Sequence, residues 1–213
     1  MPLAPYFFIA SVHTAFIRSV AVTLLALLVF DYRGYGKSEG KPSEKGILLD
    51  ARAARDWLAA KAGIAPSDVV LMGQSLGGGV AVDLAAKDGA RGLVLASTFT
   101  SLPDAAKWHM PWLPVKTLMT MRLDSLQKIK NYEGPLLLSH GDADEMVPYE
   151  QGLALFRAAP GPKRMITVQG GMHNSEQPEE YRAALDEFIA SLPPLGAARR
   201  DAEVDVTVEP LRP

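Results

Sequence analysis

The sequence predicts an α/β fold in which a mostly parallel sheet is covered by helices on both faces. Two observations lead to this prediction. Short uninterrupted apolar runs, typical of strands buried on both faces, recur along the chain. Between them lie segments whose apolar residues recur every three or four positions, which is typical of amphipathic helices. Apolar strands that alternate with helices imply a parallel sheet with helices in its connections.

The helix over residues 44–62 is the clearest of the expected elements, because its apolar spacing is regular and Gly63 follows its end. In a sheet of this kind ligands bind beyond the carboxyl ends of the strands, so we expect the functional residues directly after the strands. We expect strands at 27–30, 69–72, 92–96, 135–139 and 165–168, and helices at 44–62, 77–87, 148–159 and 178–191.

The composition is that of an ordinary globular protein. The chain has 213 residues, a length that suits one domain with a sizeable core. Its formal net charge of -2 gives no reason to expect nucleic acid as a partner. Because the chain contains no cysteine, a disulfide scaffold, thiolate catalysis and a cysteine-ligated metal are all excluded.

Residues 1–26 form an atypical N-terminal segment. The apolar run at 20–30 is shorter than the ~20 residues that a membrane-spanning helix needs. Cleavage after this run, as for a signal peptide, would fall inside the strand expected at 27–30. We therefore expect a cytoplasmic protein, with membrane association or export as the minor alternative. Residues 27–193 would form the core, with a short lid at 98–130, and residues 194–213 a flexible tail.

The segment Gly73-Gln-Ser-Leu-Gly77 fits the pattern Gly-x-Ser-x-Gly and lies between an expected strand and an expected helix. A nucleophile elbow is built in this context, as a sharp turn that raises the serine hydroxyl above the sheet. Glycines two positions before and after the serine remove collisions where strand and helix converge. Ser75 is therefore the candidate nucleophile, and the backbone N–H of Leu76 is the candidate donor to an oxyanion.

Two other interpretations of this segment remain open. It could be a glycine-rich packing turn with an ordinary serine, which the following Gly78 and Gly79 would also suit. It could also be a phosphate-binding loop, although the Gly-Lys-Ser/Thr that such a loop requires does not follow.

A serine hydroxyl needs an adjacent base, which is usually histidine. After such an elbow the base follows the acid in chain order, and His173 follows the last expected strand. The acid should follow the preceding strand, where Asp142, Asp144 and Glu145 all qualify on position. Such a carboxylate accepts the Nδ1–H of the base and stabilises the imidazolium, but spacing alone does not choose among the three.

We predict structural roles for two further histidines. We expect His140, which precedes the candidate acids, to shape its turn. We expect His109 to pack under the lid.

Residues 27–193 resemble the α/β-hydrolase superfamily, and in particular its serine aminopeptidase-like branch, which includes acyl-protein thioesterase relatives. Four motifs carry the resemblance, although Met172 stands where a small residue is more usual. The resemblance implies the α/β-hydrolase fold, and it selects Asp144 as the acid beside Ser75 and His173. The motifs are Phe30-Asp-Tyr-Arg-Gly-Tyr-Gly-Lys-Ser38, Gly73-Gln-Ser-Leu-Gly77, His140-Gly-x-x-Asp144-x-x-Val147-Pro148 and Gly171-Met-His173-Asn174.

The N-terminal segment departs from that family, whose His-Gly loop after the third strand supplies a second oxyanion donor. We predict that residues 6–12 form this central strand, beside 69–72, because an empty central slot would leave two rows of backbone donors and acceptors unpaired. His13-Thr-Ala15 would then be a degenerate loop. The N–H of Thr14 or Ala15 would then be the second donor. The other interpretation is a truncated or misread start with the first strands missing. Loss of one oxyanion donor typically lowers the rate by ~10²–10³.

These features predict a serine hydrolase, either an esterase, a thioesterase or a peptidase-like enzyme, that requires neither a metal nor an organic cofactor. The alternative is a catalytically impaired or non-catalytic member of the fold that acts as a binding module. The apolar lid favours a small-molecule or acylated substrate with an apolar group, unless its apolar residues simply cover the sheet. Those residues are Phe99, Trp108, Met110, Trp112, Leu113, Leu118 and Met119.

Overall fold

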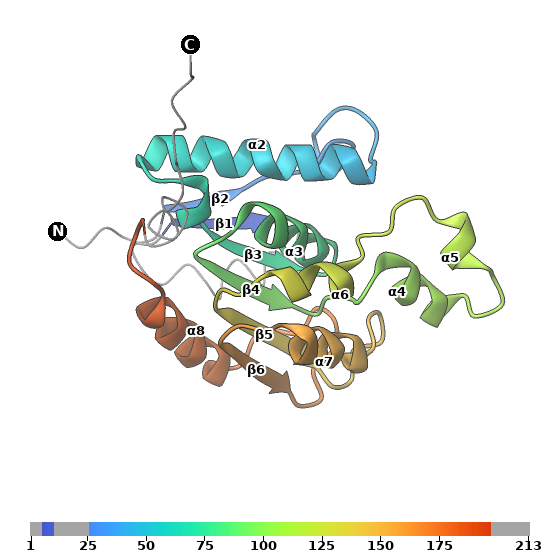
Figure 1. The fold of residues 1–213 in the computed structure, drawn as a ribbon. Coiled ribbons are helices and arrows are strands. Elements are labelled where there is room, and N and C mark those ends of the chain that lie inside the picture. Colours follow the sequence, from blue (N-terminus) through green and yellow to red (C-terminus); the bar gives the residue numbers. More distant parts are fainter. Residues whose placement is uncertain (1–5, 11–25, 197–213) are drawn as a thin grey trace, which may run out of the picture.

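A six-stranded parallel sheet forms the centre of the molecule (Figure 1). The computed structural model describes residues 6–10 and 26–196. The strands lie in the order β2-β1-β3-β4-β5-β6, and every neighbouring pair is parallel. The α/β architecture predicted from the sequence is thereby confirmed. The strands are β1 (Tyr6–Ala10), β2 (Ala26–Val29), β3 (Val70–Gln74), β4 (Gly92–Ala96), β5 (Leu136–Gly141) and β6 (Lys163–Val168).

Helices cover both faces of the sheet, as expected. Successive strand residues point to opposite faces, so Leu71 belongs to the apolar cluster that includes residues of α2, α3 and α7, while Met72 belongs to the cluster that includes α8. Among the described helices, α8 packs on the face opposite to α2, α3 and α7 (Figure 1). The helices are α2 (Glu44–Ala62), α3 (Leu76–Asp88), α4 (Leu102–His109), α5 (Val115–Leu118), α6 (Ser125–Lys128), α7 (Tyr149–Ala158) and α8 (Glu179–Ser191), with short 3-10 turns at Pro66–Asp68 and Ile129–Asn131.

The first strand takes the central position that was predicted for the N-terminal segment. Within β1, Phe8 pairs with Leu28 of β2 on one side and with Leu71 of β3 on the other. Ala10 pairs with Gly73, so β1 ends level with the start of the Gly-x-Ser-x-Gly turn. The prediction is confirmed for residues 6–10, whereas residues 11 and 12 of the predicted strand lie outside the described residues. Residues 197–213, the main part of the expected tail, also lie outside them.

Helix α2 ends where its sequence indicates. The Ser43 side chain caps the first turn by accepting a hydrogen bond from the Gly46 N–H at 3.1 Å. Gly63 ends the helix in the left-handed conformation, with φ of 67°, and its N–H reaches the carbonyls of Ala59 and Ala60.

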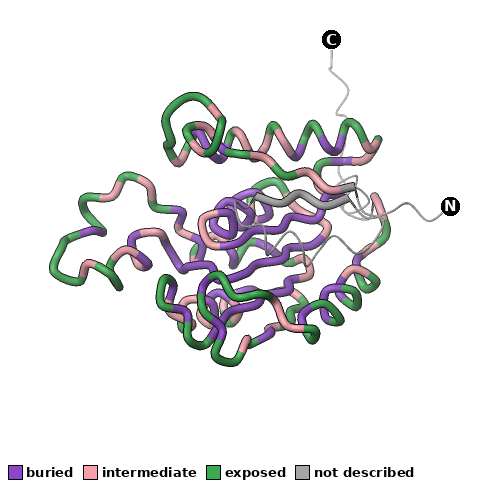
Figure 2. The backbone as a smooth tube through the Cα atoms, turned by 180° about the vertical axis from the view of Figure 1, so that it is seen from behind, coloured by how far each residue is buried: buried purple, intermediate pink, exposed green. Residues whose placement is uncertain are grey.

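Residues 98–130 leave the body of the protein after β4 and return before β5. Helices α4 and α5 of this segment stand away from the sheet (Figure 1), and its outer part, residues 107–118, is mostly exposed (Figure 2). The prediction that His109 packs under a lid is wrong. This side chain is exposed on α4, and its Nε2 lies 2.8 Å from the carbonyl oxygen of Met146. His109 lies in the exposed last turn of α4, which leaves it at the surface.

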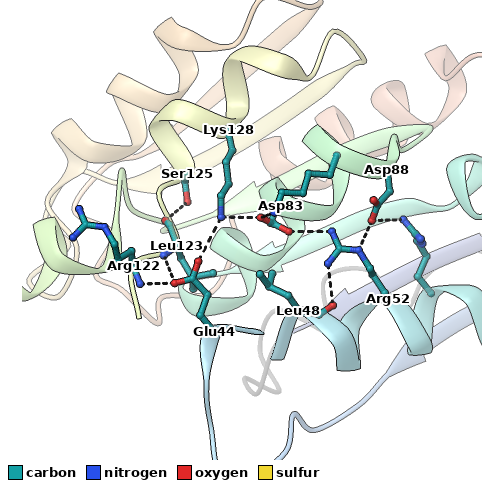
Figure 3. A network of polar contacts seen from close by, with 11 residues as sticks. Glu44, Leu48, Arg52, Asp83, Asp88, Arg122, Leu123, Ser125 and Lys128 are labelled. Atoms are coloured by element: carbon teal, nitrogen blue, oxygen red, sulfur yellow. Dashed lines mark hydrogen bonds and ion pairs between the residues drawn. The ribbon is translucent and has the colours of Figure 1, made fainter. Parts of the chain in front are cut away.

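A charge network joins α2, α3 and α6 on the outer side of the helical layer (Figure 3). The Asp83 carboxylate is fully buried on α3 and contacts Arg52 at 3.1 Å, Lys87 at 2.9 Å and Lys128 at 2.7 Å. Burial alone would raise the pKa of Asp83, but the hydrogen bonds from Lys128 and Lys87 outweigh it and hold this pKa below its usual value. The three cations therefore keep the carboxylate charged.

Glu44, at the start of α2, extends this network to the returning end of the 98–130 segment. Its Oε2 accepts the backbone N–H of Arg122 at 2.7 Å and that of Leu123 at 3.3 Å. Leu123 is fully buried and adopts a positive φ of 43°, which is strained for a leucine. The carboxylate of Glu44 thus stabilises an unfavourable backbone conformation at the base of the segment.

We expect Asp83→Asn to lower the free energy of unfolding by about 3 kcal/mol, because it leaves Arg52, Lys87 and Lys128 without their shared anion. Urea denaturation measures the loss. Glu187→Gln is the control, since Glu187 pairs with Arg164 at the exposed surface and should change stability by less than about 1 kcal/mol.

The cost of Asp83→Asn should also depend on pH. Because the pKa of Asp83 is depressed in the folded state, its stabilising contribution is present above its unfolded pKa of about 3.9 and is lost as the pH falls further. The stability difference between the two proteins should therefore shrink below about pH 4. A difference that is independent of pH would contradict the proposed ion pairing.

Candidate active site

The Gly-x-Ser-x-Gly segment forms a sharp turn between β3 and α3. Ser75 has φ of 50° and ψ of −118°, a conformation that serine rarely adopts and that stores strain. A Cβ on Gly73 would overlap the carbonyl group of Gly77, so the close approach that was predicted between the two glycines is present. The Ser75 side chain is half-buried at the carboxyl end of the sheet. This is the geometry of a nucleophile elbow.

The end of β4 supports this elbow from the side. The Thr98 hydroxyl is buried and donates a hydrogen bond of 2.8 Å to the Ser75 carbonyl oxygen. The Ser75 N–H donates to the Ala96 carbonyl at 3.0 Å. A Cβ on Gly78 would overlap the Thr98 hydroxyl, so this glycine makes room for the contact. Sequence reasoning missed Thr98, and the unexplained Gly78 was the one signal that pointed to it.

Asp144 and His173 form a buried pair. His173 Nδ1 lies 2.8 Å from Asp144 Oδ2, and both residues are less than a tenth exposed. The structure therefore brings together the acid and the base that were predicted. Asp142 is exposed, and its Oδ1 accepts the Gly170 N–H instead, so it holds the histidine loop without touching the imidazole. Glu145 is exposed as well.

The Asp144 carboxylate accepts three hydrogen bonds and faces a fourth donor. Oδ1 accepts the backbone N–H groups of Met146 at 2.9 Å and Val147 at 2.8 Å. Oδ2 faces His173 Nδ1 and, at 3.2 Å, His140 Nε2. Burial alone would raise the pKa of Asp144, but the hydrogen bonds from His140, His173 and Val147 hold it well below its usual value. The acid is therefore ionised at neutral pH and available to an imidazolium.

His140 shapes the acid turn, as the sequence predicted. Its side chain is fully buried, and Nε2 lies 2.9 Å from the Val147 carbonyl oxygen across the turn. Its contact with Asp144 was not foreseen.

Gln74 connects the elbow to the histidine loop. Its buried side chain donates a hydrogen bond of 3.2 Å from Nε2 to the carbonyl oxygen of His173. Gln74 directly precedes Ser75, so this bond ties the backbones of the candidate nucleophile and base together across 99 positions of the chain. Gln74 occupies a variable position of the Gly-x-Ser-x-Gly pattern, so the pattern did not indicate this role.

Only part of the predicted oxyanion site lies within the described residues. Leu76 is the first residue of α3, where backbone N–H groups have no carbonyl partner inside the helix and the helix dipole is positive. The predicted donor therefore belongs to the N–H groups that have no carbonyl partner inside the helix, and its role stays a prediction. Thr14 and Ala15, the candidates for the second donor, and His13 beside them lie outside the described residues, and their role stays a prediction.

Among the described residues, no group of three or more histidine, aspartate or glutamate side chains is placed to hold a metal ion. No helix in that part of the chain has both the length and the apolar character needed to cross a bilayer.

A sequence model of the alpha/beta hydrolase family matches residues 4–124. The chain belongs to this family. The match includes the central strand and the elbow at Ser75, whereas Asp144 and His173 lie beyond it. For this alpha/beta hydrolase, the pairing of acid and base thus depends on the geometry described above.

Curated relatives share about two fifths of the aligned residues. An uncharacterized protein of Mycobacterium tuberculosis is 41% identical over 162 residues, which are 76% of this chain and 58% of that protein. Alpha/beta hydrolase domain-containing protein 17B of Homo sapiens is 36% identical over 169 residues, which are 76% of this chain and 55% of that protein. The chain therefore spans less than two thirds of the length of either relative.

Solved structures show the same fold at lower sequence identity. Est1E from Butyrivibrio proteoclasticus, determined with ferulic acid bound, superimposes with a TM-score of 0.72 at 22% identity and covers 89% of both chains. An esterase of Pyrococcus furiosus reaches a TM-score of 0.73 at 19% identity, over 90% of this chain and 83% of that one. At these identities the likeness concerns the fold.

We expect Thr98→Val to lower the free energy of unfolding by about 1 kcal/mol, because the isosteric side chain cannot donate to the Ser75 carbonyl. Thr98→Ser keeps the hydroxyl and should lose less. Thermal and urea denaturation measure both, and equal losses in the two variants would show that the hydrogen bond does not support the elbow.

Proposed function

We propose that this chain is a serine hydrolase that cleaves an acyl ester, thioester or amide through an acyl-serine intermediate. The observation that carries the proposal is the buried Asp144–His173 pair at the same end of the sheet as the strained Ser75 elbow. Membership of the alpha/beta hydrolase family supports it.

The arrangement assigns a role to each group. Because His173 Nδ1 faces Asp144, the hydrogen on Nδ1 is held by the carboxylate, and Nε2 is left free to act as the base. Nε2 takes the Ser75 hydroxyl proton as Oγ attacks the substrate carbonyl, and it then returns this proton to the leaving group. Water repeats the two steps and releases the acid, so that Ser75 is regenerated.

Asp144 and Leu76 stabilise the charges that develop during these steps. The ionised Asp144 carboxylate stabilises the imidazolium form of His173, while the Leu76 N–H and the positive end of α3 face the oxyanion. The second oxyanion donor is proposed to be the N–H of Thr14 or Ala15.

The substrate is proposed to carry an apolar acyl group. Phe99 is buried and covers the core, but Trp108, Trp112 and Leu118 of the segment after β4 are 61%, 74% and 64% exposed. These three side chains therefore do not cover the sheet. Met146 and Met172, which adjoin the acid and histidine loops, are also exposed. An apolar surface of this kind favours an apolar ligand over a charged one.

We expect Ser75→Ala to abolish covalent labelling by a fluorophosphonate probe while the fold, checked by circular dichroism and thermal unfolding, remains intact. The control is Ser67→Ala, because Ser67 precedes β3 at the opposite end of the sheet. Full labelling of Ser75→Ala would refute the nucleophile assignment. Absence of labelling in the unaltered chain would favour a non-catalytic binding module.

Asp144→Asn should lower kcat/KM for a p-nitrophenyl acyl ester by about 10⁴-fold, because a neutral amide favours the wrong tautomer of His173. Asp142→Asn is the matched control. An asparagine oxygen can still accept the Gly170 N–H, so the loss there should be small. Equal losses in the two variants would contradict the assignment of the acid.

A further inference from the structure

The proposed mechanism uses only one of the two histidines that touch Asp144. His140 is buried at the end of β5, four positions before the acid, and its Nε2 lies 3.2 Å from Asp144 Oδ2. The same nitrogen lies 2.9 Å from the Val147 carbonyl oxygen. His140 does not belong to the proton path of the proposed reaction, so its contact with the acid calls for an explanation.

The partners of His140 define its tautomer. Both groups that face Nε2 are hydrogen-bond acceptors, a carboxylate and a carbonyl, so Nε2 must carry a hydrogen. The opposite tautomer would point a lone pair at two oxygen atoms. Among the described residues, Nδ1 is buried and has no hydrogen-bond partner. His140 is therefore best described as an imidazole whose Nε2–H bonds to the Val147 carbonyl and also faces Asp144 Oδ2.

Helix α7 holds the ring in this position. A Cβ on Gly152 would overlap His140 Nδ1, so only glycine leaves room for the imidazole there. The ring of Tyr149 packs edge-on against it, with 5.9 Å between the ring centroids. The ring cannot turn away from Asp144 without displacing this helix.

The contact with His140 occupies the last lone-pair direction of the Asp144 carboxylate. A carboxylate offers about four lone-pair directions, and two backbone N–H groups occupy those of Oδ1. Oδ2 is left with two directions, one toward His173 and one toward His140. If His140 did not donate, Oδ2 could shift toward the space beside it and misalign the hydrogen bond to His173.

We propose that His140 is a positioning residue, whose Nε2–H holds Asp144 Oδ2 in line with His173 Nδ1. The proposal rests on the proposed function, since it assigns His140 an effect on the same triad. His140 acts through Asp144 and does not touch the reacting atoms.

A double-mutant cycle separates positioning from a merely structural role. His140→Asn removes the donor at the Nε2 position, because the asparagine amide reaches only as far as Nδ1. It should lower kcat about tenfold and change KM little. A tenfold loss is the size of effect that the loss of a hydrogen bond to a charged group typically has. In an Asp144→Asn background the same substitution should cost nothing further. An equal loss in both backgrounds, or no loss in either, would overturn the proposal.

The conservative variant provides a rescue. The amide of His140→Gln extends to the Nε2 position and can donate there, so this variant should keep most of kcat while His140→Asn does not. Gly152→Ala tests the same contact from the other side of the ring. Its methyl group should push the intact imidazole out of line and reproduce the loss of kcat, again only when Asp144 is present. A loss in His140→Gln as large as in His140→Asn would count against the proposal.

A measurement that does not depend on enzymatic turnover tests the positioning role of His140 separately from the proposed function. In the proton NMR spectrum of the full chain, one low-field imidazole N–H signal should disappear in His173→Gln. This signal reports the hydrogen bond between His173 and Asp144. It should move in His140→Asn and stay in His140→Gln. If Ser75-dependent probe labelling is absent but this signal responds as described, the proposed function fails and the positioning by His140 stands. If labelling is present and the signal ignores both substitutions, the positioning fails alone.

Discussion

The close approach of α3 to the end of β3 is the constraint on which the rest of the site depends. The chain reverses within one residue at Ser75, and the carbonyl of Gly77 occupies the space where a side chain at position 73 would lie. This contact raises the serine above the sheet, and it places the N-terminus of α3 directly beside the serine. The positive φ of Ser75 is unfavourable, so the surroundings must hold it. Thr98 and Ala96 do so from the neighbouring strand, through the carbonyl and the N–H of Ser75.

The second half of the site comes from β5 and β6, and it too depends on a close backbone approach. A Cβ on Gly141 would overlap the carbonyl of Gly171, so the end of β5 lies directly against the histidine loop. The Ala143 N–H donates to the Gly171 carbonyl at 3.1 Å, which joins the acid loop to the histidine loop. Gln74 then reaches across from β3 to the His173 carbonyl. The histidine loop is therefore held by the end of β5, by the acid loop and by Gln74 of β3. Its position follows from these contacts to its backbone as well as from the Asp144–His173 pair.

The fold and the residues at strand ends were largely predictable, because both follow from local pattern. Helix α2 and strand β4 have the predicted bounds, and the central position of β1 followed from the cost of an empty slot in the sheet. Strands β3 and β5 each run two residues further than their apolar runs, to Gln74 and Gly141, because strand pairing continues into residues that serve the site. Spacing could not choose among three acids, and the family resemblance selected Asp144 before the geometry did. Sequence reasoning missed Thr98, Gln74 and the contact of His140 with Asp144. Each makes a polar contact with a residue of another turn or loop, and apolar periodicity does not record such a partner.

A comparison of two buried carboxylates, Asp83 and Asp144, shows that the partners of a charged side chain determine its role. Asp83 is surrounded by three cations on the outer side of α3, where neutralisation joins helices α2, α3 and α6. Asp144 is surrounded by two backbone N–H groups and two imidazoles, and none of these four donors carries a permanent charge. A lysine or arginine in place of either imidazole would neutralise the carboxylate and leave little charge for an imidazolium. Neutral donors lower the pKa of Asp144 and fix its orientation, yet they keep its negative charge available to His173. The same residue type thus supports the fold at position 83 and is suited to orient a base at position 144, and the difference lies in the partners that surround each.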